Sequence, residues 1–173
     1  MSPQHYAIGE IDALSRDAFI AVLGGIFEHS PWVAERAWDK RPFSDTDSLH
    51  AAMRDAVEVA DASLQLALIN AHPELAGKAA IRGELTTEST REQSGAGLDQ
   101  CTADEFAELH SLNRTYRDKF GFPFILAVRG YDRAGIIDQM RRRVNNDREI
   151  ETRESLAQIY RIARFRLEDL ISK

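Results

Sequence analysis

The sequence predicts an all-α protein, a single-domain bundle of about seven to nine helices covering residues 1–173. Apolar residues recur at three- and four-residue intervals along nearly the whole chain, which is the period of a buried helix face. One apolar run, residues 121–128, has a composition that would suit a strand. Because a lone strand cannot form a sheet, we expect this run to be an extended buried segment. A chain of 173 residues with 43% hydrophobic residues is long enough to bury a sizeable core.

The first predicted helix contains the apolar residues between positions 19 and 27. Ser15 or Asp12 is its expected N-cap, because short polar side chains accept hydrogen bonds from the first backbone N–H groups of a helix. A turn at Ser30 and Pro31 should lead into a short helix over residues 32–38, and residues 41–43 should end that helix.

A long helix is expected from about residue 48 to residue 70, with Asp45, Asp47 or Ser48 as its cap. Pro73 sets its end, because the residue before a proline is pushed out of the helical region. His72 therefore belongs to the turn that leaves this helix.

The second half of the chain predicts four more helices with recognisable ends. Thr87 should cap a short helix over residues 88–96 that Gly97 stops. The others are a helix from Thr102 to about residue 120, one from Asp132 through Arg143, and a last one over about 147–171.

The charge balance argues against nucleic acid as a partner. The net charge is −6 and the pI about 5.4, whereas a nucleic-acid-binding domain shows a basic face and a high pI. The basic run at residues 141–143 is interpreted as a solvated helix end, where the helix dipole favours cations.

The chain is expected to be cytoplasmic. No run of about 18 apolar residues predicts a membrane span, and residues 1–9 lack the pattern of a secretory signal. The last residues, 171–173, stop short of the Ser-Lys-Leu peroxisomal address. The single cysteine, Cys101, excludes an intrachain disulfide; a catalytic thiolate there is a minor alternative.

The densest group of chemically useful side chains lies between residues 72 and 93. His72 can exchange a proton near neutral pH, with Pro73 fixing its turn and Gly77 allowing close approach of the backbone. The alternative is a histidine that only caps the preceding helix. Ser89, Glu92 and Gln93 share one helix face, because they are three and four residues apart. They could present a hydroxyl, a carboxylate and an amide to one ligand, or form an exposed polar surface.

Arginines of the last helix are candidates for binding an anion. A guanidinium matches a carboxylate with two parallel hydrogen bonds, and Arg161, Arg164 and Arg166 are all on that helix. At least two of these should be ordinary surface residues. The sequence has no glycine-rich phosphate loop, no zinc-type cysteine or histidine spacing and no nucleophile elbow, so a metal site is only weakly supported and none is predicted.

Several short motifs together resemble one enzyme family. They are FEHSPWV (27–33), RPF (41–43), HPELAG (72–77), STREQ (89–93) with AGL (96–98), FGFPF (120–124) and RFRL (164–167). In this order they resemble the 2-oxo-4-hydroxy-4-carboxy-5-ureidoimidazoline (OHCU) decarboxylases, from about residue 10 to 171. No motif position departs from the pattern of that family.

The resemblance implies an all-α, cofactor-free, typically dimeric enzyme that performs the last step of urate breakdown to (S)-allantoin. The resemblance places this step after those of urate oxidase and 5-hydroxyisourate hydrolase, and it suggests association with one of these enzymes. The resemblance makes His72, Glu92 and Arg166 catalytic, with Arg164 as an alternative to Arg166. It places these residues against the substrate: Pro73, Ser89, Thr90, Arg91, Glu92, Gln93, Phe124, Ile125, Leu126, Ala127 and Val128.

Those residues suit a cofactor-free decarboxylation. The protein must orient the carboxylate, stabilise negative charge and deliver one proton to one face. Two alternatives come from other classes: a helical scaffold that binds pathway partners, and a metal-dependent ureide amidohydrolase. The first should not bind allantoin or a purine analogue, and the second should be inhibited by a chelator.

Overall fold

The computed structural model describes residues 4–172, which form ten α-helices, one 3-10 helix and no strand. Eight of the α-helices have at least seven residues, so the predicted all-α fold is confirmed. The expectations for residues 1–3 and 173, which concern a signal and a targeting address, lie outside the described residues. Within 4–172, no helix is both long enough and apolar enough to cross a bilayer.

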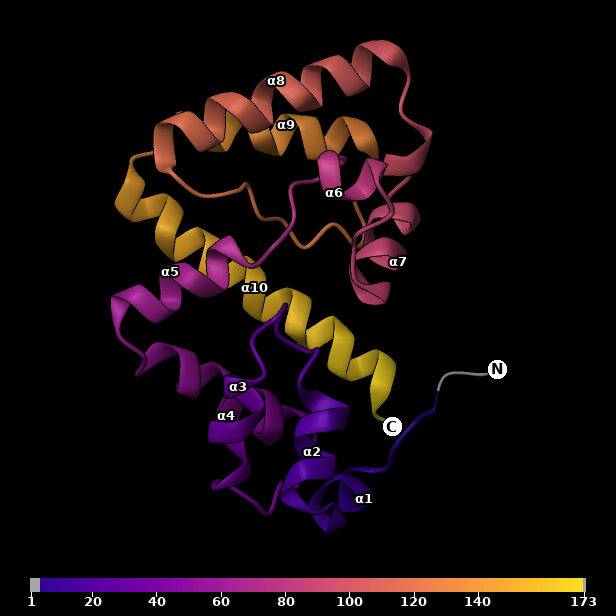
Figure 1. Cartoon of the computed structure of the whole chain (residues 1–173), viewed down its shortest axis with the longest axis vertical. Coiled ribbons are helices and arrows are strands. Elements are labelled where there is room, and N and C mark those ends of the chain that lie inside the picture. The colour runs from indigo at the N-terminus through magenta and orange to yellow at the C-terminus, as the bar shows by residue number, and fades with distance from the viewer. Residues whose placement is uncertain (1–3, 173) are drawn as a thin grey trace. The chain divides into compact units, whose positions relative to one another are not determined.

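The chain forms two compact units, one made of residues 4–71 with 160–172 and the other of residues 72–159. The first unit contains α1 (Ile8–Ala13), α2 (Arg16–Leu23), α3 (Trp32–Trp38), α4 (Thr46–Glu58), α5 (Ala62–Asn70) and the C-terminal part of α10 (Arg148–Leu170). In this unit α3 packs against α2 and α4 (Figure 1).

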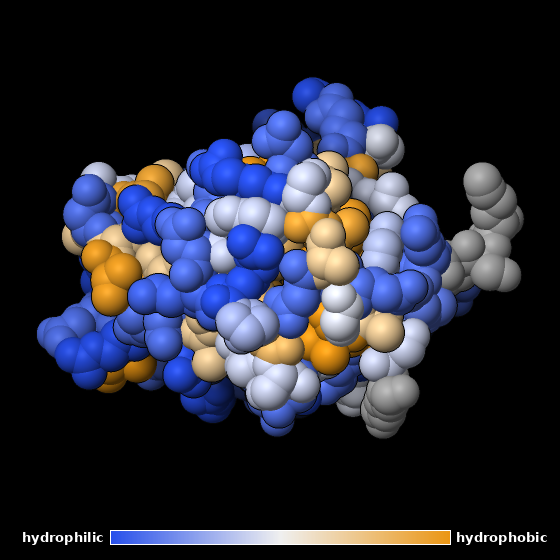
Figure 2. Space-filling model, turned by 90° about the horizontal axis from the view of Figure 1, so that it is seen from below, coloured by the Kyte–Doolittle hydropathy of each residue, from blue (hydrophilic) through white to orange (hydrophobic). Residues whose placement is uncertain are grey.

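Aromatic packing forms part of the core of the first unit. The Phe19 ring meets Trp38 edge-on at 5.3 Å and stacks on Phe43 at 6.3 Å. The Arg41 guanidinium lies over the ring of Trp38, 3.1 Å from its centre. Seen from below, the surface is mostly hydrophilic, with hydrophobic residues in small separate patches (Figure 2).

The second unit contains α6 (Lys78–Ile81), α7 (Thr87–Gly95), η1 (Leu98–Gln100), α8 (Ala103–Phe120), α9 (Arg133–Arg143) and the N-terminal part of α10. Helices α8 and α9 pack side by side (Figure 1). Caps begin both helices as predicted, because Thr102 accepts from the N–H of Glu105 and Asp132 from that of Gly135. Gly121, with φ of 79°, ends α8 in the left-handed conformation.

The segment after α8 has no helix or strand, and residues 122–128 are buried. This confirms the extended segment predicted for the apolar run. Tyr116 packs against the rings of Phe120, Phe122 and Phe124 at 4.5–6.0 Å. The segment therefore enters the core of the second unit through its phenylalanine side chains.

Four sequence predictions need correction. The expected helix over 48–70 is two helices, because Asp61 accepts a hydrogen bond from the N–H of Leu64 and starts α5. Helix α7 is capped by Thr86 rather than Thr87. The short helices α1 and α6 were not predicted, since four to six residues carry too little periodicity. Arg143 is not solvated: its side chain is fully buried.

Candidate functional site

His72 lies in an irregular turn, residues 72–77, that begins two residues after the end of α5. We call these six residues the His72 turn. The side chain is not an exposed helix cap, because only 7% of His72 is exposed. Ala76 in the same turn has φ of 50°, a conformation that costs a non-glycine residue free energy and that neighbouring contacts must hold.

Side chains from two helices bind the backbone of the His72 turn. Gln93 Oε1, on α7, accepts a hydrogen bond of 2.9 Å from the N–H of Ala76, and its Nε2 donates at 3.4 Å to the carbonyl of Glu74. Asn113 Nδ2, on α8, donates at 2.9 Å to the carbonyl of Leu75. Gln93 therefore uses both ends of its amide on this turn, a use that the sequence did not reveal.

The predicted site residues of α7 divide into two groups. Ser89 and Gln93 are 4% and 6% exposed, and Glu92 is half-buried. Thr90 and Arg91 are exposed. The structure therefore places Ser89, Glu92 and Gln93 on the inner side of the helix, as their spacing predicts.

The buried segment 124–128 is held by two polar side chains. Arg143 Nη1 donates at 2.5 Å to the carbonyl of Ile125, and its guanidinium lies 4.4 Å from the centre of the Phe124 ring. Gln158 Oε1 accepts a hydrogen bond of 3.0 Å from the N–H of Ala127. Any ligand contact at Ala127 must therefore use an atom other than this N–H.

Arg143 is itself part of a buried ionic network. Its Nη2 lies 2.8 Å from Glu151 Oε2, and both side chains are 0% exposed. The Tyr116 hydroxyl donates to the same carboxylate oxygen at 2.5 Å. Burial, followed by the bond to Glu151, raises the pKa of the Tyr116 hydroxyl. The phenol thus stays protonated and serves as a donor.

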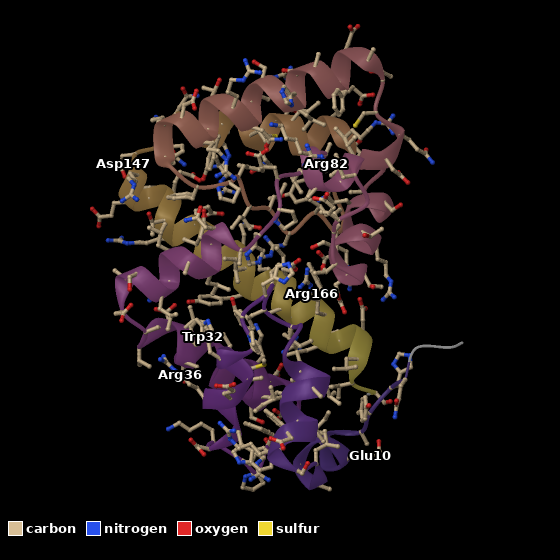
Figure 3. The ribbon with its side chains drawn as sticks, in the orientation of Figure 1. Glu10, Trp32, Arg36, Arg82, Asp147 and Arg166 are labelled. Atoms are coloured by element: carbon tan, nitrogen blue, oxygen red, sulfur yellow. The ribbon has the colours of Figure 1, made fainter. Side chains whose placement is uncertain are left out.

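The predicted arginines of α10 belong to the first unit, and Arg166 is labelled in Figure 3. Arg166 is 6% exposed; its Nη1 lies 2.8 Å from Glu28 Oε2 and donates at 3.1 Å to the carbonyl of Gly25. Arg164 is about a third exposed and pairs with Glu168 and Asp47. The hydrogen bond to Glu168, followed by the one to Asp47, raises the pKa of Arg164. Of the two candidates, Arg166 is the buried one.

Sequence reasoning missed Glu28, Asn113, Arg143 and Glu151 as structural partners of the predicted site residues. Only Asn113 left a usable signal: it is a polar residue within the apolar stripe of α8, which also contains Leu109, Tyr116 and Phe120. An amide in such a position requires a hydrogen-bond partner.

Two further features lie apart from the predicted residues. A cavity of about 690 Å³ in the first unit has none of the predicted site residues in its lining. It is lined by Arg36 of α3, by residues of α4, and by Lys40, Pro42, Phe43 and Val59. Burial raises the pKa of the Cys101 thiol, which disfavours the thiolate.

In the described part of the chain, no three histidine, cysteine or acidic residues are grouped as metal ligands.

Comparison with known proteins gives matches over nearly the full length. The family model described as OHCU decarboxylase matches residues 12–168. The 2-oxo-4-hydroxy-4-carboxy-5-ureidoimidazoline decarboxylase of Haloferax volcanii is 42% identical over 163 residues, which are 94% of this chain and 95% of that protein.

Longer proteins contain a region similar to this chain. The uric acid degradation bifunctional protein PucL of Bacillus subtilis is 41% identical over 168 residues, 97% of this chain but 33% of that protein. The crystal structure of an (S)-allantoin synthase matches with a TM-score of 0.78 at 29% identity, covering 95% of this chain and 54% of that one.

Proposed function

Because the chain belongs to the OHCU decarboxylase family, we propose that it converts 2-oxo-4-hydroxy-4-carboxy-5-ureidoimidazoline to (S)-allantoin and carbon dioxide without a cofactor. The observation that carries the proposal is the match with the Haloferax volcanii decarboxylase over 94% of this chain and 95% of that protein. The family match over residues 12–168 supports treating residues 1–173 as one OHCU decarboxylase-like domain. The cytoplasmic location expected from the sequence stays a prediction.

The chemistry requires a place for one electron pair. When the bond between the ring carbon and the carboxylate breaks, carbon dioxide leaves and the pair moves onto the nitrogen of the neighbouring C=N unit. The carbon that lost the carboxylate is then joined by a double bond to the former C=N carbon, and the nitrogen takes up a proton. The hydroxyl on the first carbon loses its proton and becomes the carbonyl, while a proton delivered to one face of the former C=N carbon gives the chiral product. The protein must orient the carboxylate and stabilise negative charge as it develops.

We assign the proton transfer to His72, whose buried turn is fixed by surrounding contacts. Glu92 and Ser89 suit the N–H groups of the ureido arm, because a carboxylate and a hydroxyl both accept hydrogen bonds. Gln93 can add only the donor and acceptor capacity that its bonds to the His72 turn leave. The remaining substrate contacts that the resemblance implies are Pro73 and the exposed residues Thr90 and Arg91.

Arg166 is assigned the binding of the carboxylate or a ring oxygen, because a buried guanidinium attracts an anion strongly. We also assign backbone N–H groups of Ile125, Leu126 and Val128 to binding this negative charge. The N–H of Ala127 is not included, because it donates to Gln158. The apolar side chains of Phe124 and Ile125 would exclude water and strengthen each electrostatic contact.

The test follows allantoin formation by circular dichroism, with urate converted in situ by urate oxidase and hydroxyisourate hydrolase in the presence of EDTA. Wild-type protein should produce the (S)-allantoin signal much faster than spontaneous decay. His72→Gln should lower the rate by roughly 10²–10⁴-fold, whereas the exposed His110→Gln should not. A wild-type signal no faster than spontaneous decay contradicts the activity, and inhibition by EDTA would favour the metal-dependent alternative.

We further propose a homodimer that associates with another enzyme of urate breakdown, either 5-hydroxyisourate hydrolase or urate oxidase. The dimer rests on the family resemblance alone. The association is supported by PucL, a bifunctional uric acid degradation protein of which this chain matches a third. Light scattering gives the oligomeric state, and a monomer would contradict the dimer. Co-sedimentation with each enzyme tests association, and sedimentation of this protein alone in both mixtures would contradict it.

A further inference from the structure

Three side chains from two helices contact three successive residues of the His72 turn. Arg117 Nε donates at 2.8 Å to Glu74 Oε1, Asn113 Nδ2 to the carbonyl of Leu75, and Gln93 accepts from the N–H of Ala76. Asn113 and Arg117 are four residues apart, so they lie on one face of α8. Helix α8 thus contacts the turn at two adjacent positions.

The turn has a conformation that requires such support. Ala76 adopts φ of 50°, which a non-glycine residue keeps only where its surroundings hold it. A Cβ atom on Gly77 would lie 2.8 Å from the Cβ of Glu74, so the chain folds tightly back on itself there. Without its side-chain contacts, the turn should relax and its first residue, His72, should move.

Burial distinguishes the two α8 contacts. Asn113 is 4% and Leu75 7% exposed, so removing the Asn113 amide leaves the Leu75 carbonyl buried without its donor, at the cost of that carbonyl's desolvation. The Arg117 side chain is 47% exposed, so removing it leaves no buried group unsatisfied. A substitution of Arg117 should therefore disturb the fold less than a substitution of Asn113.

We propose that Asn113 and Arg117 are positioning residues that hold the His72 turn and thereby fix the imidazole of His72 for proton transfer. The proposal rests on the role proposed above for His72. A displacement of about 1 Å at a reacting group can cost roughly 100-fold in rate. Because neither residue is assigned to the substrate, losing them should lower kcat and leave KM nearly unchanged.

The experiment compares Asn113→Leu and Arg117→Leu with two controls in the same unit, an exposed amide at Asn145 and an arginine at Arg141 that is about as exposed as Arg117. Asn145→Leu removes an amide that donates to the carbonyl of Arg141, and Arg141→Leu removes an exposed partner of Glu108. Thermal unfolding and far-ultraviolet circular dichroism establish that each variant folds. We expect kcat to fall roughly 10- to 100-fold for Asn113→Leu, less for Arg117→Leu, and not at all for the controls. Arg117→Lys should recover part of the loss.

A second measurement does not depend on activity. The chain has five histidines, so the imidazole proton resonances can be followed by NMR, with His72 assigned by its loss in His72→Gln. Arg117→Leu should shift the His72 resonance and Arg141→Leu should not. An unchanged kcat and an unshifted His72 resonance in folded Arg117→Leu would overturn the positioning role. If wild-type protein were inactive, the proposed function would fail, and the NMR comparison would still decide the positioning role.

Discussion

Arg166 and Glu28 form an ion pair of 2.8 Å between side chains that are 5% and 1% exposed. The guanidinium comes from α10 and the carboxylate from the segment between α2 and α3. Two charges removed from water in this way depend on each other, because either one alone would be left uncompensated. Glu28 thus allows the chain to bury the cation to which we assign the substrate anion.

The first prediction concerns the stability of this pair. Glu28→Gln should lower the free energy of unfolding by about 3–5 kcal/mol, since it leaves the Arg166 charge buried without its counter-charge. Adding Arg166→Met should restore much of that loss. Urea unfolding of the two single variants and the double variant measures this. As a control, Glu149→Gln, from a pair 77% exposed on both sides, should change stability by about 0.5 kcal/mol or less. A Glu28→Gln protein as stable as wild type would contradict the prediction.

The second prediction concerns the buried Tyr116 hydroxyl. Tyr116→Phe removes a 2.5 Å hydrogen bond to a fully buried carboxylate, and should cost about 1.5–3 kcal/mol of stability. Tyr131→Phe, at a half-buried tyrosine of the same unit, should change stability by about 0.5 kcal/mol or less. Chemical denaturation measures both, and equal effects in the two variants would refute the special role of the Glu151 contact.

The third prediction uses two glycines near the candidate site. Gly77→Ala would place a Cβ 2.8 Å from Glu74 Cβ, so we expect a loss of about 1–3 kcal/mol together with a lower kcat. Gly95→Ala, at the end of α7, meets nothing within 4 Å and should be neutral or stabilising by up to about 1 kcal/mol. Thermal melts and the allantoin assay distinguish the two. Normal activity in Gly77→Ala would show that the turn is less constrained than its geometry indicates.

The fourth prediction concerns acid stability. Burial lowers the pKa of His50 below its usual value of 6.5, although its Nε2 lies 2.8 Å from the carbonyl of Tyr160. As pH falls through 6.5, the unfolded chain takes up this proton before the folded one, so His50 reduces stability on acidification. Charges around it act in both directions: Arg164 and Arg54 lower its pKa, and Asp47 raises it.

The pH dependence is measured by urea unfolding at pH 8, 6.5 and 5. His50→Gln should lose less stability than wild type over this range, because one of the groups that binds protons on unfolding is gone. His5→Gln, at an exposed histidine, serves as the control. If wild type and His50→Gln show the same slope between pH 8 and 5, the assignment to His50 is wrong.

The helical pattern predicted the fold class because buried helix faces repeat every three to four residues regardless of tertiary contacts. It failed at residues 59–61, where the apolar period continues through a break that Asp61 creates by capping α5. A local hydrogen bond overrode the pattern there. The extended segment 121–128 was predicted correctly, because its lack of a partner strand can be read from the sequence.

The chemistry of the candidate site was less accessible to sequence reasoning. The spacing predicted that Ser89, Glu92 and Gln93 share one helix face. It could not predict the hydrogen bond that the N–H of Ala76 donates to Gln93, because these residues are 17 apart in the sequence. Asn113 reaches Leu75 across 38 residues. The choice between Arg164 and Arg166 depends on burial, and two arginines two residues apart look alike until the core is known.

Two backbone amides in segments without regular structure bond to side chains: Ala76 to Gln93 and Ala127 to Gln158. Amide protons in such loops usually exchange with solvent quickly, because nothing holds them closed. These two should exchange slowly, and only for as long as their side-chain partners stay in place. They are therefore internal reporters of local opening, and deuterium uptake at these two amides would show which of the two segments opens first.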